Sequence, residues 1–428
     1  MEKTGITSVR RLTELGGRTA TLLDNQEVRV LISDRGGMTP ELSAVSVPGS
    51  PGRINAHWNP WFRGNGMDHY QHDKHGAFWK ASLLYNLTGT FPCLPNFGPG
   101  HMVDGIEVPP HGWSANELWR CTSFGSDETT AWAVSFMEIG KNTGTGVTPF
   151  PLRCTKIDAV IAGQPVHYTS LAIENTGDKS VSINVGWHNT VGAPFLETGC
   201  RISACAETWN TAPEGGEFDD TGRLVLGKPF ETLAKAPLRS GGTTDLSLVP
   251  PPIGYTDLVS GKVPAGTDLG WSAVVNPHQQ MVYICFFPGP GAAEPDEIAL
   301  TFNNLWMQYG GRSFTPWAPY EGGTDLTYCL GTENSVGAFA NGLEYARKHP
   351  TLMGNPTLVE IPARGKRILR YGTLFAPYKA EALSSGIVHI TGEREGLRCK
   401  ATGNTFGETL FRADPTFSLL KRLEKSID

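Results

Sequence analysis

The sequence predicts an all-β protein, on three observations: many alternating strand patterns, numerous turn residues and few helical segments. Of its 428 residues, 51 are glycine and 31 are proline, without a collagen-like period. Such a composition is typical of many short elements joined by turns. Hydrophobic residues make up 39% of the chain, which is enough for a sizeable core. A mostly antiparallel sheet sandwich is favoured over a closed barrel because the strand patterns are unevenly spaced.

Alternation of polar and apolar side chains marks the strands. The clearest case is PVHYTSLAIENTGDKSVSINVGWH, residues 165–188, in which two alternating runs flank the turn-forming residues ENTGDKS. Two such runs around a turn predict a long β-hairpin. Similar patterns predict strands within residues 27–37, 130–140, 279–287, 297–309 and 366–376.

Helices are predicted at three places, two of them near the ends of the chain. One is a short helix at residues 8–17, and another spans 337–350 and ends at its proline. The third, an amphipathic helix at about 414–426, follows an Asp-Pro start signal. Because no repeat or linker divides the chain, we expect a single domain over residues 1–428 with its β core at about 27–376.

Charge and cysteine content limit the expected partners and the expected cellular location of the protein. The net charge is -6 with dispersed Lys and Arg, which gives no electrostatic reason to expect a nucleic acid or an anionic membrane as partner. No apolar run is long enough for a membrane span, and the first residues do not resemble a signal peptide. The eight widely spaced cysteines are typical of reduced, mostly buried thiols. We expect a cytoplasmic protein, with an exported form that has lost its leader as the alternative; the oligomeric state is not indicated.

Three polar stretches interrupt the β pattern. HGWSANELW, residues 111–119, carries His111; VGWH ends in His188; and LGTENSVGAF contains Glu333 just before the predicted helix. Each residue also has a structural explanation. His188 can donate to a backbone carbonyl at a strand end, His111 can be a turn residue, and Glu333 can be a first-turn acid favoured by the helix dipole.

Taken in order, these stretches resemble the aldose 1-epimerase (galactose mutarotase-like) superfamily over residues of about 27 to 376. The likeness consists of a His-Gly step followed by Trp, a strand pair ending in His, and a late strand ending in Glu. EIPARGKRILRYGTLF, residues 360–375, then follows as a hairpin into a last core strand. VGWHNTVGAPFLETGCRI, residues 185–202, most closely resembles larger members of the superfamily.

The resemblance implies a galactose mutarotase-like β-supersandwich with short helical additions at the termini. It also implies that His188 protonates the ring oxygen of a sugar, that Glu333 takes the proton of the anomeric hydroxyl, and that His111 helps to hold the substrate. A histidine with a pKa near 6.5 and a glutamate with a pKa near 4.3 exchange protons near neutral pH. We expect the two groups on opposite sides of a small ring, brought together by distant strands, and no organic cofactor.

The sequence also departs from the superfamily pattern. Classical mutarotases follow the acid histidine with proline and aromatic residues, whereas this chain has Asn189 and Thr190. They follow the base with Thr-Gln, whereas Asn334 and Ser335 stand here. The substrate arginine of an Asn-x-Arg motif has no clear counterpart, because Arg63 lies in a different context. The sugar is therefore not identified by the sequence.

One stretch is particular to this chain: HWNPWFRGNGMDHYQHDKHGAFW, residues 57–79. Its aromatic rings beside polar groups suit a sugar, which has one apolar face and a hydroxyl edge. A packed loop without metal is the default interpretation, and a divalent metal on His69, His72 and His75 is a minor alternative. The residues predicted to bind substrate, from this stretch and elsewhere, are Trp61, Arg63, Trp113, Trp119, Trp306, Gln308 and Arg312.

The sequence thus predicts a carbohydrate-active isomerase of aldose 1-epimerase type acting on a small sugar or sugar derivative. Two alternatives stay open on the same fold: a metal-assisted epimerase of a keto-sugar or uronate, and a non-catalytic carbohydrate-binding protein. A polysaccharide lyase is disfavoured because it needs a basic groove to neutralise uronates, and the charges here are dispersed.

Overall fold

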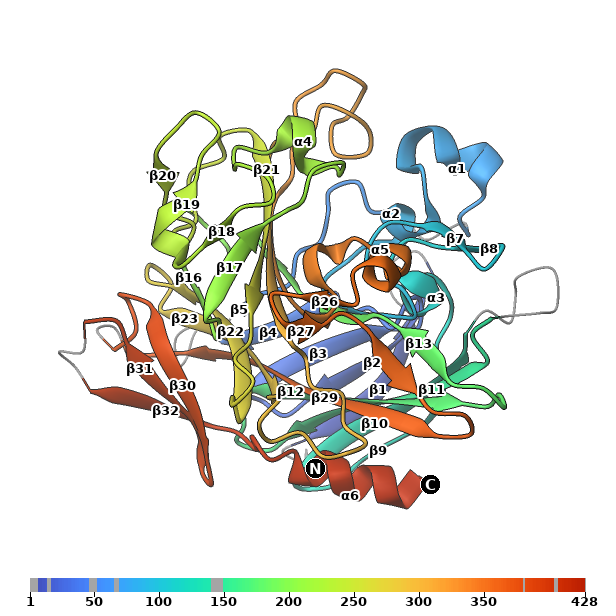
Figure 1. Cartoon of the computed structure of the whole chain (residues 1–428). Helices are drawn as coiled ribbons and strands as arrows, with labels where there is room; N and C mark the ends of the chain where they lie inside the picture. The colour runs from blue at the N-terminus through green and yellow to red at the C-terminus, as the bar shows by residue number, and fades with distance from the viewer. Residues whose placement is uncertain are drawn as a thin grey trace.

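Two large antiparallel sheets form the body of the protein (Figure 1). The computed structural model describes residues 7–13, 17–45, 52–64, 69–139, 149–379, 382–403 and 407–427. The first sheet, which we call the wide sheet, runs in the order β16 (Arg201–Ala204), β22 (Leu269–Asn276), β23 (Met281–Pro288), β29 (Lys366–Pro377), β12 (Val166–Asn175), β11 (Leu152–Ile161), β10 (Thr130–Glu138) and β9 (Arg120–Ser126).

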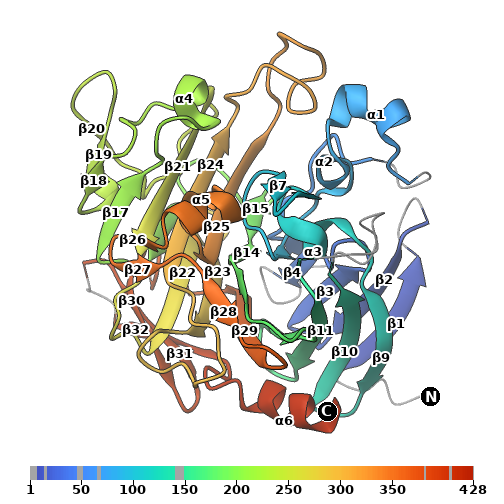
Figure 2. The same cartoon turned by 45° about the vertical axis from the view of Figure 1, so that its right-hand side comes forward.

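The second sheet carries the candidate site, and we call it the site sheet (Figure 2). Its order is β18 (Pro229–Phe230), β17 (Thr208–Thr211), β21 (Tyr255–Lys262), β24 (Phe302–Tyr309), β25 (Tyr328–Val336), β14 (Val185–His188) and β6 (Phe91–Cys93), with β15 (Thr190–Gly192) also paired to β25.

Two further sheets flank this body, one from each end of the chain. The N-terminal sheet contains β1 (Ser8–Thr13), β2 (Thr19–Asp24), β3 (Val28–Ser33), β4 (Glu41–Val45) and β5 (Arg53–Asn55), and the C-terminal sheet contains β30 (Ile387–Glu393), β31 (Gly396–Ala401) and β32 (Glu408–Arg412). Four two-stranded pairs complete the strands: β7 (His101–Val103) with β8 (Ile106–Val108), β13 (Val181–Ile183) with β28 (Val359–Ile361), β19 (Ala236–Pro237) with β20 (Thr243–Thr244), and β26 (Thr351–Leu352) with β27 (Asn355–Pro356).

Helices are short. They are α1 (His72–Trp79), α2 (Ser82–Asn86), α3 (Gly112–Asn116), α4 (Phe218–Thr221), α5 (Leu343–Lys348) and α6 (Ser418–Ile427), with 3₁₀ turns at Leu233–Lys235 and Ala338–Ala340. Within the described ranges, no helix combines the length and apolar character needed to cross a bilayer. The eight cysteines, all of them described, form no disulfide, and six are buried. The mostly antiparallel sandwich predicted from the sequence is confirmed.

Strand β23 of the wide sheet is buried on both faces, which explains why its sequence is almost continuously apolar. Tyr283, Cys285 and Phe287 enter the main core shared with the site sheet and the N-terminal sheet. The alternate residues Ile284 and Phe286 enter a second core, beneath the C-terminal sheet and α6. The C-terminal segment therefore covers an apolar face that would otherwise meet water.

The predicted hairpin at residues 165–188 is wrong. Strand β12 pairs with β11 and β29 in the wide sheet, whereas β14 pairs with β6 and β25 in the site sheet. The side chain of Asn175 redirects the chain between them, because its amide donates to the carbonyls of Lys179 and Ile361 and its oxygen accepts from the Gly177 amide. Strands β28 and β29 likewise lie in different sheets, so residues 360–375 form no hairpin either.

The helix predicted at residues 8–17 is also wrong where the structure describes it, because residues 8–13 form β1; residues 14–16 lie outside the described ranges. Pairing with β2 gives this short segment its hydrogen bonds, and Arg11 forms two further bonds with Asp34. Such tertiary contacts outweigh weak local helix preference. Residues 337–350 form a 3₁₀ turn and the short α5 rather than one helix, since Phe339 within the turn and Gly342 just before α5 adopt positive φ angles.

The predicted C-terminal helix is confirmed as α6, although it begins at Ser418 rather than Asp414. The Asp414 carboxylate accepts hydrogen bonds from the Ser418 hydroxyl and the Leu419 amide, which caps the helix. Leu420 is fully buried in the second core. Glu424 accepts a two-pronged ion pair from Arg370 of β29.

Leu420→Ala should destabilise the protein by about 2–5 kcal/mol, because it leaves a cavity between α6 and the wide sheet. Arg422→Ala, an exposed position on the same helix, is the matched control and should change stability little. Thermal unfolding followed by circular dichroism measures both. Equal melting temperatures for the two variants would contradict the docking of α6 described here.

Candidate active site

His188 and Glu333 meet across neighbouring strands of the site sheet. Trp187 of β14 lies opposite Asn334 of β25, so the next residue along the same register places His188 opposite Glu333. His188 Nε2 lies 3.1 Å from Glu333 Oε1. Two residues 145 positions apart in the sequence thus form one hydrogen-bonded acid/base pair.

The imidazole of His188 is held on four sides. Its ring stacks on Phe91 of β6 at 4.6 Å between centroids, and its Nδ1 lies 3.0 Å from the Thr190 hydroxyl. The rings of His111 and Trp306 meet it edge-on, at 4.9 and 5.8 Å. Because both ring nitrogens have partners and the ring plane is fixed by Phe91, His188 presents Nε2 in one orientation.

Glu333 lies in the middle of β25, not before a helix, so no helix dipole stabilises its charge. Its side chain is only 2% exposed, and its second oxygen, Oε2, is buried without a hydrogen-bond partner among the described residues. Gly331, two residues earlier on the same face, leaves room for the carboxyl group. A Cβ atom at Gly331 would lie 3.0 Å from Glu333 Oε1 and 3.1 Å from Trp306 Cβ.

His111 reaches the pair from the residue that precedes α3. Its backbone is left-handed, with φ 56°, and its amide donates to the carbonyl of Gly98. The Nδ1 atom is buried and has no hydrogen-bond partner within the described ranges, although the side chain as a whole is partly exposed. His111 therefore combines an edge contact to His188 with a ring nitrogen that has hydrogen-bonding capacity to spare.

Burial decides the protonation states of Glu333, His188 and His111. It raises the pKa of Glu333 to about 8, with a smaller contribution from Glu217. Burial also lowers the pKa of His188 well below its usual value, helped by His111, and lowers that of His111 to about 4. Near neutral pH the pair is therefore uncharged overall and holds one proton to transfer between Glu333 and His188.

An aromatic cluster with one arginine covers the pair. Trp58 stacks on Trp317 with nearly parallel rings, and Trp306 meets both of them edge-on. The Arg312 guanidinium lies 4.2 Å above the Trp317 ring and forms an ion pair with Glu217 at 3.0 Å. Arg312 is 4% exposed, so this cation is desolvated among aromatic faces.

A buried hydrogen-bond network lies beneath the pair and joins the two large sheets. The Asn189 amide donates to the Tyr371 hydroxyl of β29, and its oxygen accepts from Thr90 and from Tyr283 of β23. The Tyr371 hydroxyl in turn donates to Asn334 on β25. Residues directly after His188 and Glu333 are thus fixed to the wide sheet, which limits movement of both strands.

The other predicted substrate-binding residues are distributed differently. Trp306 and Arg312 lie in the cluster above the pair, whereas Gln308 is fully buried and bonds Thr256 and Asp325. Trp113 and Trp119 are buried in the main core.

Two further candidates come from the chain-specific stretch at residues 57–79. Trp61 is 45% exposed at the outer edge of the cluster, in contact with Phe62. Arg63 follows it, partly buried. The ring contacts of His188 described above come instead from Phe91, His111 and Trp306.

The three histidines considered for a metal do not converge. His69 faces Arg35, His72 faces the Tyr70 hydroxyl, and His75 accepts from the Gln71 amide. Among the described residues, no group of three His, Cys, Asp or Glu side chains is placed to hold a metal ion. His72 and His75 lie on α1, where a loop was predicted.

Comparison with solved structures identifies the architecture. A candidate aldose 1-epimerase from Klebsiella pneumoniae superimposes with a TM-score of 0.61 and 13% identity, over 87% of this chain and 84% of that one. A galactose mutarotase-like protein from Clostridium acetobutylicum gives 0.55 and 10%, over 87% and 99%. The protein has the galactose mutarotase-like fold. No family model and no curated protein matches the sequence.

A further similar structure covers more of the chain than the other two do. A TPR-domain-containing protein from Parabacteroides distasonis matches 96% of this chain and 55% of its own length, with a TM-score of 0.51 and 9% identity. At identities this low the likeness concerns the fold, and the chemistry has to be argued from the side chains.

Sequence reasoning missed several residues of this candidate site. Thr190 was noted only as a departure from the superfamily, although its position two residues after His188 is the spacing that puts side chains on one face of a strand. Phe91 and Trp317 come from distant segments and carry no local signal. Glu217 immediately precedes α4 and forms an ion pair with Arg312 of the aromatic cluster, a contact between segments far apart in the sequence.

Glu333→Gln should change how stability depends on pH. The folded-state pKa of Glu333 is raised, so its contribution to stability is full below about pH 4.5 and is lost as the pH rises through about 8. Between pH 6.5 and 9 the wild type should lose about 2 kcal/mol of stability that the Gln variant retains, most of it below pH 8. Denaturant unfolding at both pH values measures this.

The exposed Glu360→Gln serves as the control and should follow the wild type. Because the pKa of His188 is lowered, this residue affects the pH dependence of stability only below about pH 6.5, where it becomes protonated in the unfolded state. Measurements between pH 6.5 and 9 therefore report on Glu333 rather than on His188. Parallel pH profiles for wild type and Glu333→Gln would show that the carboxyl group is not held protonated by burial.

Proposed function

We propose that the protein is a carbohydrate-active isomerase of the aldose 1-epimerase type, which opens and recloses a sugar hemiacetal by general acid/base catalysis. The buried 3.1 Å contact between His188 and Glu333 carries the proposal. It supplies a proton donor and a proton acceptor side by side, near neutral pH, on a fold shared with mutarotase-like proteins.

Adjacent groups suit this chemistry. In a hemiacetal the ring oxygen and the anomeric hydroxyl are bonded to the same carbon, so an acid and a base that lie together can serve both at once. Groups on opposite sides of the sugar ring, as expected from the sequence, are not needed for this step. The 3.1 Å contact between His188 on β14 and Glu333 on β25 supports the adjacent arrangement.

Each step balances protons within the pair. Transfer of the shared proton from Glu333 to His188 Nε2 gives a carboxylate and an imidazolium. Glu333 then takes the proton of the anomeric hydroxyl while His188 gives its proton to the ring oxygen, and the bond between that oxygen and the anomeric carbon breaks. Rotation of the aldehyde and the reverse sequence close the other anomer. The total charge of the pair does not change, which suits a buried site.

Substrate entry needs movement of the covering side chains, because His188 and Glu333 are 8% and 2% exposed. Arg312 and its partner Glu217 lie over the aromatic cluster, and Glu217 is itself exposed. In the proposal, Trp306 and Trp317 contact the apolar face of the sugar, and His111 donates to or accepts from a hydroxyl through its partly exposed ring.

Glu333→Gln and His188→Asn should each slow anomer exchange on the order of a hundredfold or more, because each removes one partner of the proton relay. Exchange is measured by NMR on a panel of freshly dissolved aldoses and uronic acids. Glu360→Gln and His389→Asn, both exposed, are the matched controls and should keep wild-type rates.

Near-full activity in both site variants would refute the assignment. Calorimetric sugar binding that survives in Glu333→Gln, with no exchange by the wild type, would identify a non-catalytic binding protein instead. Exchange that disappears after treatment of the wild type with a chelator and returns with metal would favour the metal-assisted epimerase.

A further inference from the structure

The ion pair above the acid/base pair joins a buried cation to a carboxylate at the surface. The side chain of Arg312 is 4% exposed and that of Glu217 is 57% exposed, with 3.0 Å between Arg312 Nη2 and Glu217 Oε2. An exposed charge loses little when its partner leaves, because water replaces the partner, whereas a buried charge without a partner is costly. Arg312 therefore needs a carboxylate at this place more than Glu217 needs Arg312.

The guanidinium of Arg312 is held between aromatic rings. Its central carbon lies 4.2 Å from the centroid of the Trp317 ring and 5.6 Å from that of the Trp306 ring. Such contacts fix the plane of the guanidinium before any ligand arrives. A ligand that binds Arg312 therefore meets a cation whose orientation is already set.

A second carboxylate near Arg312 has other partners. Asp325 accepts hydrogen bonds from the backbone amides of Arg312 and Thr327 and from the Gln308 side chain. Burial raises the pKa of Asp325, which weakens it as a counter-charge. The carboxylate at ion-pair distance from the Arg312 guanidinium is that of Glu217.

Glu217 lies in a turn with few constraints. It stands directly before α4 and follows Gly215 and Gly216. A Cβ atom at either glycine would meet no atom beyond the neighbouring residues within 4 Å, so this turn borders open space. The amides of both glycines donate to Asp219, which belongs to the same short segment. Glu217 can thus leave Arg312 without displacing a packed side chain.

Trp306 lies between Arg312 and the acid/base pair. Its ring meets the His188 ring edge-on at 5.8 Å between centroids, and it also contacts the Arg312 guanidinium. The charge of Glu217 acts on Glu333 as well, where it adds to the effect of burial on the pKa. A sugar on the Trp306 ring therefore has the acid/base pair on one side and the cation on another.

We propose that the substrate is an acidic sugar of the hexuronate class, whose carboxylate replaces Glu217 on Arg312. In a hexuronate pyranose the carboxylate is attached to C5, which is bonded to the ring oxygen that His188 protonates. Arg312 holds this end of the sugar while His188 and Glu333 act at the ring oxygen and the anomeric hydroxyl. The inference rests on the proposed function, and it makes Arg312 a substrate-binding residue and Glu217 its internal competitor.

The occupant that Arg312 already has favours a carboxylate over other groups. One guanidinium matches one negative charge, and its planar donors fit a carboxylate, as the contact with Glu217 illustrates. A neutral hexose leaves Arg312 paired with Glu217 and gains no charged contact. A phosphate dianion carries more charge than one arginine offsets.

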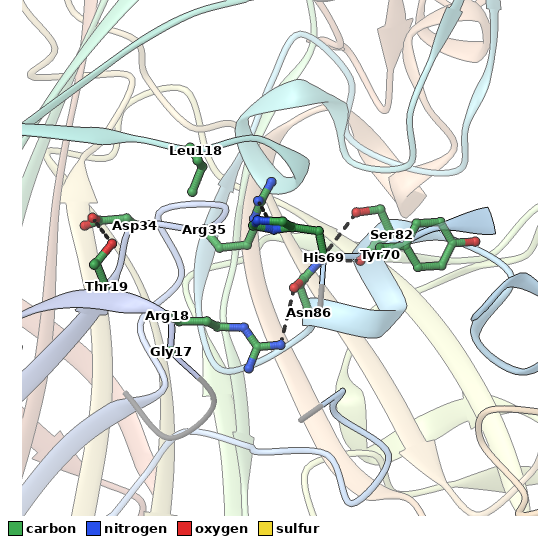
Figure 3. A pocket seen from close by; sticks show the side chains of 10 residues that line it. All are labelled: Gly17, Arg18, Thr19, Asp34, Arg35, His69, Tyr70, Ser82, Asn86 and Leu118. Carbon is green, nitrogen blue, oxygen red and sulfur yellow. Dashed lines mark hydrogen bonds between the residues drawn. The ribbon is translucent and has the colours of Figure 1, made fainter. Parts of the chain in front are cut away.

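A second polar cavity could attract acidic sugars too, but it lies elsewhere. Figure 3 shows this cavity, about 230 Å³ in volume, with Arg18 and Arg35 in its wall. Its wall is formed by the ends of β2 and β3, residues around α1 and α2, and Leu118. Neither Arg312 nor Glu217 is among the described residues that line it. Binding there is therefore unaffected by substitution of Arg312, which distinguishes the two places.

The test measures anomer exchange by NMR with D-glucuronate and D-galacturonate and with D-glucose and D-galactose, the parent hexoses. Each uronate differs from its parent at C6, and the two hexose 6-phosphates are included as sugars with another anionic group. The kcat/KM of the preferred uronate should exceed that of its parent hexose about tenfold or more, because the uronate gains a hydrogen bond between charged groups. Calorimetric titration of the wild type with the same sugars measures binding independently of turnover.

Two variants should change uronate recognition in opposite directions. Arg312→Gln removes the cation and should raise the KM for the uronate about tenfold or more, with a smaller effect on the parent hexose. Glu217→Gln removes the competing carboxylate, so the KM for the uronate should fall. A purely structural ion pair would give both variants the same effect, because each breaks it. Arg398→Gln, which breaks the surface ion pair with Glu393, is the matched control and should behave like the wild type.

Failure of this inference and failure of the proposed function give different results. Exchange of a parent hexose or of a 6-phosphate as fast as that of the uronate overturns the uronate assignment and leaves the isomerase standing. An unchanged uronate KM in Arg312→Gln does the same. Should Arg312→Gln fail to fold, a uronate KM that is unchanged or raised in Glu217→Gln overturns it.

Absence of exchange with every sugar refutes the isomerase, and calorimetry then decides the Arg312 site by itself. Uronate binding that is tighter than hexose binding and is weakened by Arg312→Gln supports the site. Equal binding of uronate and hexose, or no binding of either, overturns it.

Discussion

The site depends on one constraint in the hydrogen bond between His188 and Glu333. The two ionisable groups are buried together, so the carboxyl group keeps its proton and the imidazole stays neutral. Burying a charged carboxylate alone among β24, β25 and β14 would be costly. Burial meets this constraint by raising the pKa of Glu333 and lowering the pKa of His188. The same condition that makes the pair tolerable in a core makes it able to move a proton near neutral pH.

Much of the surrounding architecture serves to keep that pair in register. The network from Asn189 through Tyr371 to Asn334 ties both site strands to the wide sheet. The wide sheet is itself covered on its outer face by the C-terminal sheet and α6. A chain that only needed a stable sandwich would have little reason to place so many polar side chains between its sheets, where each must be satisfied.

The order of short motifs was enough to predict the sandwich and to select His188, Glu333 and His111. Local patterns do not show which strands pair. The alternation at residues 165–188 is the same whether the two strands form a hairpin or belong to two sheets. Trp113 and Trp119 look like sugar-stacking residues in a sequence, yet they pack in the main core. Protonation could not be predicted either, because burial is a property of the assembled structure.

Gly331 gives the site a second marker that no catalytic argument would select. Since even a methyl group at this position would crowd both the glutamate and the neighbouring indole, the missing side chain is part of the site's shape. Distant homologues with the same site should therefore show glycine two residues before the glutamate. Sequences with this histidine and glutamate but with a larger residue at the glycine position should have a different conformation of the strand or lack the acid/base arrangement. The pair of glycine and glutamate therefore marks this site in a sequence more specifically than the acidic residue alone.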